Sequence, residues 1–172
     1  MQIIQCGESY SPQILAILND AIVNTTALYD YEPRSPDSMA AWFAAKRSGN
    51  FPVIGAVTES GELMGFASYG VFRPWPAYKY TVEHSVYIAA SHRGRGIGRT
   101  LLRRVIDEAQ SQDYHVLIGC IDSQNPASVA LHKAMGFQYV GTLRQVGFKF
   151  GGWLDFQLHQ LILTTPRNPL DG

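Results

Sequence analysis

The chain has 172 residues, of which 46% are hydrophobic and 16% charged, a composition that suits one folded domain and excludes a disordered protein. Its 14 Lys and Arg residues balance its 14 Asp and Glu residues, which excludes a general electrostatic attraction to nucleic acid. No stretch approaches the roughly 18 apolar residues of a membrane span, and the first residues lack a basic region followed by a long apolar run. We therefore expect a cytoplasmic protein that binds neither nucleic acid nor membrane.

The first half of the chain is predicted to form one strand, two helices and three further strands. Met1–Gln5 favours a short strand, and apolar residues three and four apart predict a helix over Pro12–Val23. Ser38 is predicted to cap a second helix that ends at Arg47. Two strand-forming runs around the turn dipeptide Ser60-Gly61 predict a hairpin, and a third run follows it. These strands are predicted over Val53–Thr58, Leu63–Phe72 and Tyr80–Ile88.

The second half of the chain alternates helices and strands. A helix over Gly98–Gln112 buries an apolar stripe made of Leu101, Leu102, Val105, Ile106 and Ala109. After it we expect a strand, a helix stopped by Gly136, and two strands, over Val116–Ile121, Asn125–Met135, Phe137–Val146 and Phe156–Leu163. The order β-α-α-β-β-β-α-β-α-β-β predicts an α/β (α+β) fold with a mixed sheet and helices on both faces. We expect one domain over residues 1–165 and a flexible tail over 166–172.

The cysteines and histidines do not have the spacing of a metal or disulfide framework. Cys6 and Cys120 are far apart and neither belongs to a CxxC motif, so we expect both thiols to be reduced. The five histidines include no HExxH or comparable ligand spacing. The sequence therefore predicts no metal site.

Three glycines, Gly94, Gly96 and Gly98, lie between a predicted strand and a predicted helix. A helix N-terminus has unpaired N–H groups and a partial positive charge, and glycine lets an anion reach those groups without a Cβ in the way. The segment therefore predicts a phosphate site, with a merely flexible turn as the alternative. The GxGxxG dinucleotide motif does not fit because Arg99 stands at its last position, and the Gly-Lys-Ser/Thr of a Walker motif is absent.

The segment from Arg93 to Gly98, RGRGIG, matches the (Q/R)xxGx(G/A) signature of the GNAT acetyltransferases. The stretch from Asn125-Pro126-Ala127-Ser128 through His132 to Gly136-Phe137 and the order of elements resemble the same superfamily over nearly the whole chain. TVEHSVY (81–87), VGFKFGGWLD (146–155) and NTTALYDYEP (24–33) resemble its phosphinothricin acetyltransferase branch, which includes acetyltransferases of methionine sulfoximine and methionine sulfone. The chain departs from some herbicide-resistance members at Phe150, where they carry His.

The resemblance implies a mostly antiparallel seven-stranded sheet and acetyl-CoA as co-substrate. It implies that the glycine loop binds the pyrophosphate through Arg93, Gly94, Arg95, Gly96, Ile97, Gly98 and Arg99. It also implies that the backbone of Val86, Tyr87 and Ile88 pairs with pantetheine, with the Val86 N–H as donor to the thioester oxygen. Asn125 and Ser128 are predicted to cap the following helix and also to meet pantetheine; capping alone is the alternative.

The catalytic prediction rests on two residues. Glu83 is predicted to be the general base, since a carboxylate in a partly desolvated cleft can take the ammonium proton; an exposed strand glutamate is the alternative. His132 stands where many GNAT enzymes carry a tyrosine near the coenzyme sulfur, so it is predicted to protonate the departing thiolate. A helix histidine packed against the sheet is the alternative.

Further residues are predicted to contact the acceptor amine. His84 and Ser85 are expected to line the substrate end, although His84 is equally explained as a core histidine. Arg73 and Lys79 suit a carboxylate on the substrate, and a pair of solvated charges is the alternative. Thr26, Tyr29 and Trp75 are expected to close the pocket, or else to serve in packing or a dimer interface.

Together these features predict an acetyl-CoA-dependent N-acetyltransferase that acts on a small amino acid or analogue by direct transfer in a ternary complex. Cys120 lies mid-strand without a basic neighbour in sequence, which disfavours a covalent intermediate. A protein N-terminal acetyltransferase and a non-catalytic coenzyme A sensor are the alternatives. The resemblance implies a homodimer, with FKFGGW reaching toward a partner's site. The sequence leaves open the physiological acceptor and activity on phosphinothricin itself.

Overall fold

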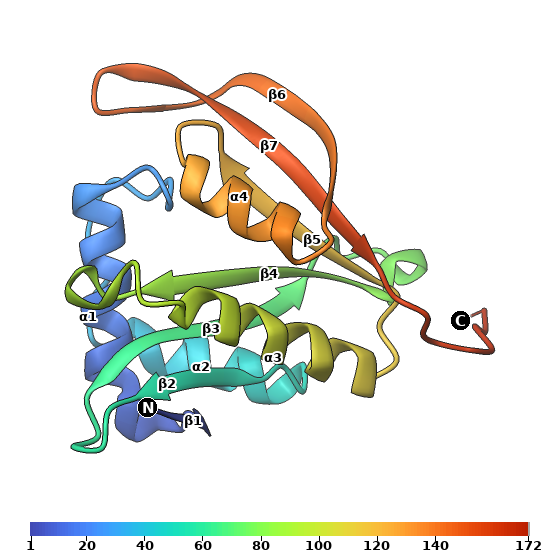
Figure 1. Ribbon diagram of the computed structural model, residues 1–172, viewed down its shortest axis with the longest axis horizontal. Helices are drawn as coiled ribbons and strands as arrows, with labels where there is room; N and C mark the ends of the chain where they lie inside the picture. Colours follow the sequence, from blue (N-terminus) through green and yellow to red (C-terminus); the bar gives the residue numbers. More distant parts are fainter. Residues whose placement is uncertain (172) are drawn as a thin grey trace. The chain divides into compact units, whose positions relative to one another are not determined.

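The computed structural model describes residues 1–171, in which seven strands and four α-helices follow one another in the predicted order (Figure 1). The strand order in the sheet is β1-β2-β3-β4-β5-β7-β6. Strands β4 (Thr81–Ile88) and β5 (Val116–Asp122) pair in parallel. The pairs β1–β2, β2–β3, β5–β7 and β6–β7 are antiparallel, which confirms the predicted mixed, mostly antiparallel sheet.

The chain divides into two compact units. The first comprises Met1–Ser68 and Val86–Leu102, and the second comprises Tyr69–Ser85 and the chain from Arg103 onward. The expectation of one domain over residues 1–165 stays a prediction. Of the predicted tail, Gly172 lies outside the described residues. The helices in residues 1–171 include none that is both long and apolar enough to cross a membrane.

Two helices and three strands build the core of the first unit. These are β1 (Gln2–Gln5), α1 (Ser11–Asn24), α2 (Ser38–Ser48), β2 (Val53–Val57) and the first part of β3 (Leu63–Val71). Buried apolar side chains of both helices pack with those of β2 and β3 in one cluster, as the helical spacing predicts. The prediction that Ser38 caps α2 is wrong: Ser38 is the first residue of the helix and Asp37 occupies the cap position, while the Ser38 hydroxyl donates to the Ser35 carbonyl at 2.6 Å.

In the second unit β6 (Gln138–Lys149) and β7 (Gly152–Ile162) form one long hairpin, drawn in orange and red in Figure 1. The predicted strand limits at Val146 and Phe156 are therefore wrong. Phe150 and Gly151 close the turn with positive φ values of 50° and 76°, which lets both strands continue. A bulge near Gln145 (φ 53°) interrupts the β6 pattern, and its N–H donates to the Asp155 carboxylate at 2.9 Å.

The remaining helices agree closely with prediction. Helix α3 covers Ile97–Ser111, and all five residues of its predicted stripe are buried. Helix α4 covers Pro126–Ala134, where the Asn125 side chain caps it by accepting the Ser128 N–H at 3.0 Å. Gly136 follows α4 with a φ of 91°, as expected of a residue that ends a helix.

Candidate active site

The glycine loop leads into the N-terminus of α3 in the first unit. Gly94 and Gly96 have φ values of 74° and 78°, a left-handed conformation that favours glycine. A Cβ built on either residue would meet no atom within 4 Å, so this side of the loop is open. The N–H groups of residues 94–98 donate no hydrogen bond to any group in residues 1–171. Free N–H groups at a helix N-terminus and open glycines together form a cradle for an anion.

The side chains of the glycine loop differ in burial and in their contacts. Ile97 is buried, so its side chain anchors the start of α3 and leaves its N–H available. Arg95 and Arg99 are exposed. The Arg93 guanidinium instead contacts the Ile88 carbonyl at 3.2 Å and the Asp20 carboxylate at 3.4 Å. In this structure the side chain of Arg93 therefore holds the loop against strand β4 and helix α1.

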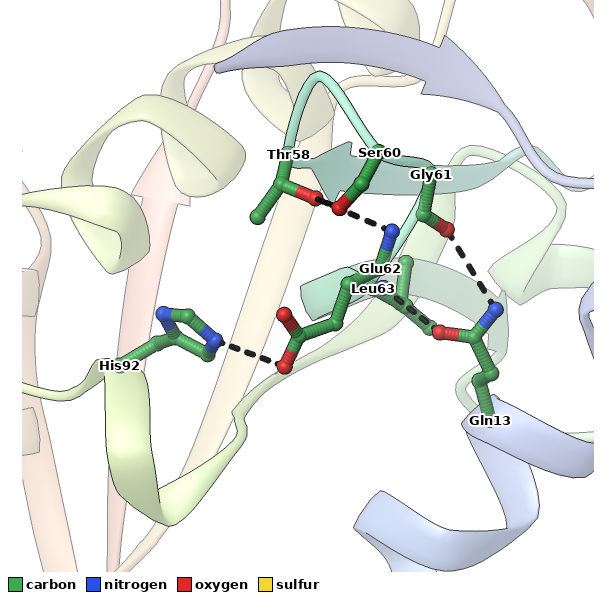
Figure 2. A network of polar contacts seen from close by, with 7 residues as sticks. All are labelled: Gln13, Thr58, Ser60, Gly61, Glu62, Leu63 and His92. Carbon is green, nitrogen blue, oxygen red and sulfur yellow. Dashed lines mark hydrogen bonds and ion pairs between the residues drawn. The ribbon is translucent and has the colours of Figure 1, made fainter.

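A second polar network joins the turn between β2 and β3 to His92, which precedes the glycine loop (Figure 2). The His92 Nε2 atom lies 3.1 Å from a Glu62 carboxylate oxygen, and the Glu62 N–H donates to the Thr58 hydroxyl. On the opposite side, the Gln13 amide accepts the Leu63 N–H at 2.6 Å and donates to the Gly61 carbonyl at 3.4 Å. The turn between β2 and β3 is thereby tied both to α1 and to the residue next to Arg93.

The last residues of β4 also belong to the first unit. Gly65 permits the close approach of β3, since a Cβ there would lie 2.7 Å from the Tyr87 carbonyl oxygen. The Tyr87 ring lies 5.5 Å from Phe66, and Val86, Tyr87 and Ile88 are half-buried. The pairing of β4 with β5 runs from Thr81 to His84, and Val86–Ile88 lie beyond that ladder. The predicted pairing of their backbone with pantetheine stays a prediction.

In the second unit Glu83 lies on the exposed face of β4. The register pairs Glu83 with Ile118, so Cys120, two residues farther along the parallel strand, lies on the same face. Burial and, after it, the charge and hydrogen bond of Glu83 raise the pKa of the Cys120 thiol, while the positive charge of Arg73 lowers it. The structure therefore brings Glu83, Arg73 and Cys120 together, and it holds Cys120 as a neutral thiol.

Of the other predicted substrate residues, His84 and Ser85 lie on β4, and the remaining four lie in two loops. Trp75 and Lys79 follow Arg73 in an exposed segment of the second unit, where Lys79 Nζ lies 5.1 Å from the centre of the Tyr80 ring. Thr26 and Tyr29 follow α1 in the first unit. A pocket closed by both groups stays a prediction.

Three histidines gather on the opposite face of the second unit's strands. The register places His84 on β4 beside Gly119 on β5, and Gly119 beside His159 on β7. His132 on α4 lies over the glycine, with its Nε2 atom 2.9 Å from the His84 Nε2 atom and its Nδ1 atom 2.8 Å from the Ser128 carbonyl oxygen. Burial lowers the pKa of His84 to about 3 and also lowers the pKa of His132. Both rings are therefore neutral at pH 7.

Sequence reasoning missed Gly119 as part of this arrangement. A Cβ there would lie 3.0 Å from ring atoms of both His84 and His132, closer than an ordinary contact, so a larger residue would have to displace the rings by a few tenths of an ångström. A glycine inside an apolar strand is itself a signal of such a close approach. Phe137, with its ring centre 5.0 and 5.1 Å from the two imidazoles, completes the enclosure. Residues 1–171 include no group of three His, Cys, Asp or Glu side chains placed to hold a metal ion.

Comparisons with known proteins agree on one kind of protein. Residues 16–137 match the sequence profile of the acetyltransferase (GNAT) family. The chain is 43% identical, over 94% of both lengths, to an L-methionine sulfoximine/L-methionine sulfone acetyltransferase of Pseudomonas paraeruginosa. It is 41% identical to an L-amino acid N-acyltransferase of Escherichia coli, covering 91% of this chain and 90% of that protein. A GNAT superfamily phosphinothricin acetyltransferase of Sinorhizobium meliloti, solved with acetyl-CoA, has a TM-score of 0.94 and 30% identity over 98% of this chain and 91% of that one.

Proposed function

The chain belongs to the GNAT acetyltransferase family, and from this premise we propose that it acetylates the α-amino group of a small amino acid of the methionine sulfoximine, methionine sulfone or phosphinothricin type. It is an N-acetyltransferase, and acetyl-CoA is its acetyl donor. The observation that carries the acceptor proposal is that a carboxylate, Glu83, and a guanidinium, Arg73, both act on the Cys120 thiol. One group can take a proton from an amine while the other binds the acid group beside that amine.

The glycine loop fits the diphosphate of acetyl-CoA. Its N–H groups from 94 to 98 are unpaired within residues 1–171, and the left-handed glycines keep side chains away from them. Two phosphate groups carry the negative charge that the N-terminus of the fifteen-residue helix α3 favours. When bound, acetyl-CoA supplies an acetyl group activated as a thioester. We assign its diphosphate to residues 93–99 and its pantetheine arm to Val86–Ile88, Asn125 and Ser128.

Glu83 performs the proton transfer that makes the acceptor reactive. The substrate amine is an ammonium ion at neutral pH, and Glu83 accepts its proton, directly or through water, so that the nitrogen lone pair becomes free. Cys120 is a poor nucleophile because its thiol is half-buried and faces the Glu83 carboxylate, which disfavours a thiolate. This supports direct transfer without an acetylated enzyme. We retain His132 as the proposed proton donor to the departing thiolate, a role for which it must first take up a proton, because its neutral ring holds a single hydrogen, on Nδ1 at the Ser128 carbonyl.

Two alternatives are weaker. A protein N-terminal acetyltransferase needs no cation for a free carboxylate beside the amine, whereas the charge of Arg73 reaches Cys120, the same thiol that the proposed base contacts. A coenzyme A sensor needs the glycine loop but has no use for Glu83. We also propose a cytoplasmic location, which suits acetyl-CoA chemistry and the two free cysteines.

Turnover of matched amines tests the proposal. Thiol release from acetyl-CoA is expected with methionine sulfoximine, methionine sulfone and phosphinothricin, and at least about ten-fold lower kcat/KM is expected when the α-carboxylate is removed or amidated, because Arg73 loses its partner. Arg73→Gln is expected to remove most of that preference. A better rate on a peptide N-terminus than on any of the free amino acids would contradict the proposal and favour the first alternative.

We propose that the chain is a homodimer that associates through the β6–β7 hairpin. β6 ends the strand order of the sheet, and its outer edge has no neighbouring strand within residues 1–171. Large apolar side chains gather toward the turn of this hairpin and stay about half exposed or more: Val146 (53%), Phe148 (47%), Phe150 (63%) and Trp153 (60%). Such a concentration on a monomer is costly in water and suits a protein interface.

The Trp153→Glu variant is expected to shift the protein from dimer to monomer in analytical ultracentrifugation, since a buried charge without a partner opposes association. Val23→Glu is the matched control, because Val23 is similarly exposed on α1 and lies outside the hairpin. A wild-type monomer, or an unchanged dimer in the Trp153 variant, would refute this assignment of the interface.

A further inference from the structure

The histidine pair in the second unit has a defined pattern of hydrogens. A carbonyl oxygen only accepts, so the 2.8 Å contact with Ser128 places a hydrogen on Nδ1 of His132. In a neutral ring the Nε2 atom of His132 then carries a lone pair. The 2.9 Å contact between the two Nε2 atoms therefore requires that His84 donates its Nε2–H to His132. Nδ1 of His84 is buried and makes no hydrogen bond of normal geometry within residues 1–171, although the Ile118 backbone acts on this ring and favours its charged form.

The surroundings hold both rings in this arrangement. His84 and His132 are each only 5% exposed, and Gly119, Phe137 and His159 lie against them. The His159 ring centre is 6.3 Å from that of His132, while the His159 Nε2 atom pairs with the Gln157 amide oxygen at 3.0 Å. His159 is the further titratable group on this face whose charge acts on His132, and Glu83 and Cys120 lie on the other face of the strands. The two imidazoles therefore form one enclosed unit.

We propose that His84 is a positioning residue for His132, that its Nε2–H fixes the His132 ring, and that Gly119 is required because it leaves room for this hydrogen bond. The inference rests on the proposed function in one respect, the assignment of His132 to the transferase reaction. Both nitrogens of His132 are engaged, one by Ser128 and one by His84. The open nitrogen of the pair is Nδ1 of His84. A proton reaches or leaves Nε2 of His132 through His84 or when their hydrogen bond opens, while the Ser128 hydroxyl lies 3.4 Å from Nδ1.

The hydrogen bond itself is testable without turnover. In protein labelled with ¹⁵N-histidine, NMR is expected to show a through-hydrogen-bond coupling between the two Nε2 atoms, with His132 as the Nδ1–H tautomer and His84 as the Nε2–H tautomer. The coupling is expected to vanish in Gly119→Ala, since the added Cβ lies 3.0 Å from both rings. Gly141→Ala is the matched control, because a Cβ on that glycine meets nothing within 4 Å. The opposite tautomers in wild-type protein would overturn the proposal.

The positioning role is tested by a conservative and a disruptive variant. His84→Gln keeps an N–H donor near the place of Nε2, and kcat is expected to stay within about three-fold of wild type. His84→Met and Gly119→Ala are expected to lower kcat about ten-fold or more through misplacement of His132, with the dissociation constant of acetyl-CoA unchanged. If the His84→Met variant folds and keeps the wild-type kcat, His84 serves only in packing and the proposal is overturned. A wild-type protein that shows the coupling but acetylates no amine would instead refute the proposed function.

Discussion

Replacing Glu83 by Gln is expected to lower kcat for amino acid acetylation by about 10²–10⁴-fold at pH 7, the range that a general base contributes. Glutamine keeps the size and hydrogen-bonding capacity of the side chain but cannot accept a proton from an ammonium ion. Because Glu83 is exposed and its side chain contacts the Cys120 thiol rather than a structural hydrogen-bond network of residues 1–171, the variant is expected to fold normally. Steady-state kinetics with measured acetyl-CoA affinity separates the two effects: the affinity should stay within about two-fold.

Cys120→Ala is the matched control for this experiment. Cys120 lies on the same face of the strand pair and touches the same carboxylate, so the variant disturbs the surroundings of Glu83 without removing the base. Direct transfer predicts that Cys120→Ala keeps kcat within a few-fold of wild type. Loss of activity in Cys120→Ala with activity retained in Glu83→Gln would reverse the assignment and point to an acetylated thiol. If the wild-type protein and both variants are all inactive, the chain is a coenzyme A sensor.

A higher pH distinguishes Glu83 from a merely electrostatic contribution. Raising the pH toward the amine's own pKa frees the lone pair without an enzymic base, so the deficit of Glu83→Gln should shrink as the pH rises. A deficit that is the same at pH 7 and pH 9 would mean that the carboxylate acts by charge or position.

The order of elements was predictable because most of them carry a strong local signal. In α3 the apolar residues recur with helical spacing and all five are buried, and α4 is bounded by a capping Asn125 and a terminating Gly136. The predicted strands of the β6–β7 hairpin are too short because the hairpin contains a bulge at Gln145 and a residue with positive φ, Phe150. Both conformations depend on contacts outside the local sequence, such as the Asp155 carboxylate that accepts the Gln145 N–H.

The candidate site was predictable where backbone alone forms it and less so where side chains meet. The glycine loop follows from three glycines before an amphipathic helix, and the structure gives Gly94 and Gly96 the expected open, left-handed conformation. From the sequence, His84 could be either a substrate-binding residue or a core residue. The alternation of side chains along a strand predicts the face on which a side chain lies but does not identify its hydrogen-bond partner. Only the register, which sets His84 beside Gly119 and under α4, reveals the hydrogen bond to His132.

Replacing Gly96 by Val is expected to weaken acetyl-CoA binding by about 10–100-fold or more, as loss of one or two charge-assisted hydrogen bonds to a phosphate would do. Gly96 has a φ of 78°, where a residue with a Cβ is strained by about 1–2 kcal/mol, so the loop is expected to shift away from this conformation. The N–H groups of residues 94–98 then no longer converge on one anion. Isothermal titration with coenzyme A measures the loss directly, and KM for acetyl-CoA should rise in parallel.

Gly61→Val is the matched control, because it separates backbone strain from ligand binding. Gly61 has a similar φ of 85°, and a Cβ there also meets nothing within 4 Å, but the residue lies in the β2–β3 turn and outside the glycine loop. Both variants should lose similar stability in thermal unfolding, whereas only Gly96→Val should lose affinity for coenzyme A. Equal losses of affinity would mean that strain anywhere in the first unit disturbs binding. Unchanged affinity for coenzyme A in Gly96→Val would contradict the assignment of the diphosphate to this loop, because the proposed site depends on the N–H groups that the valine displaces.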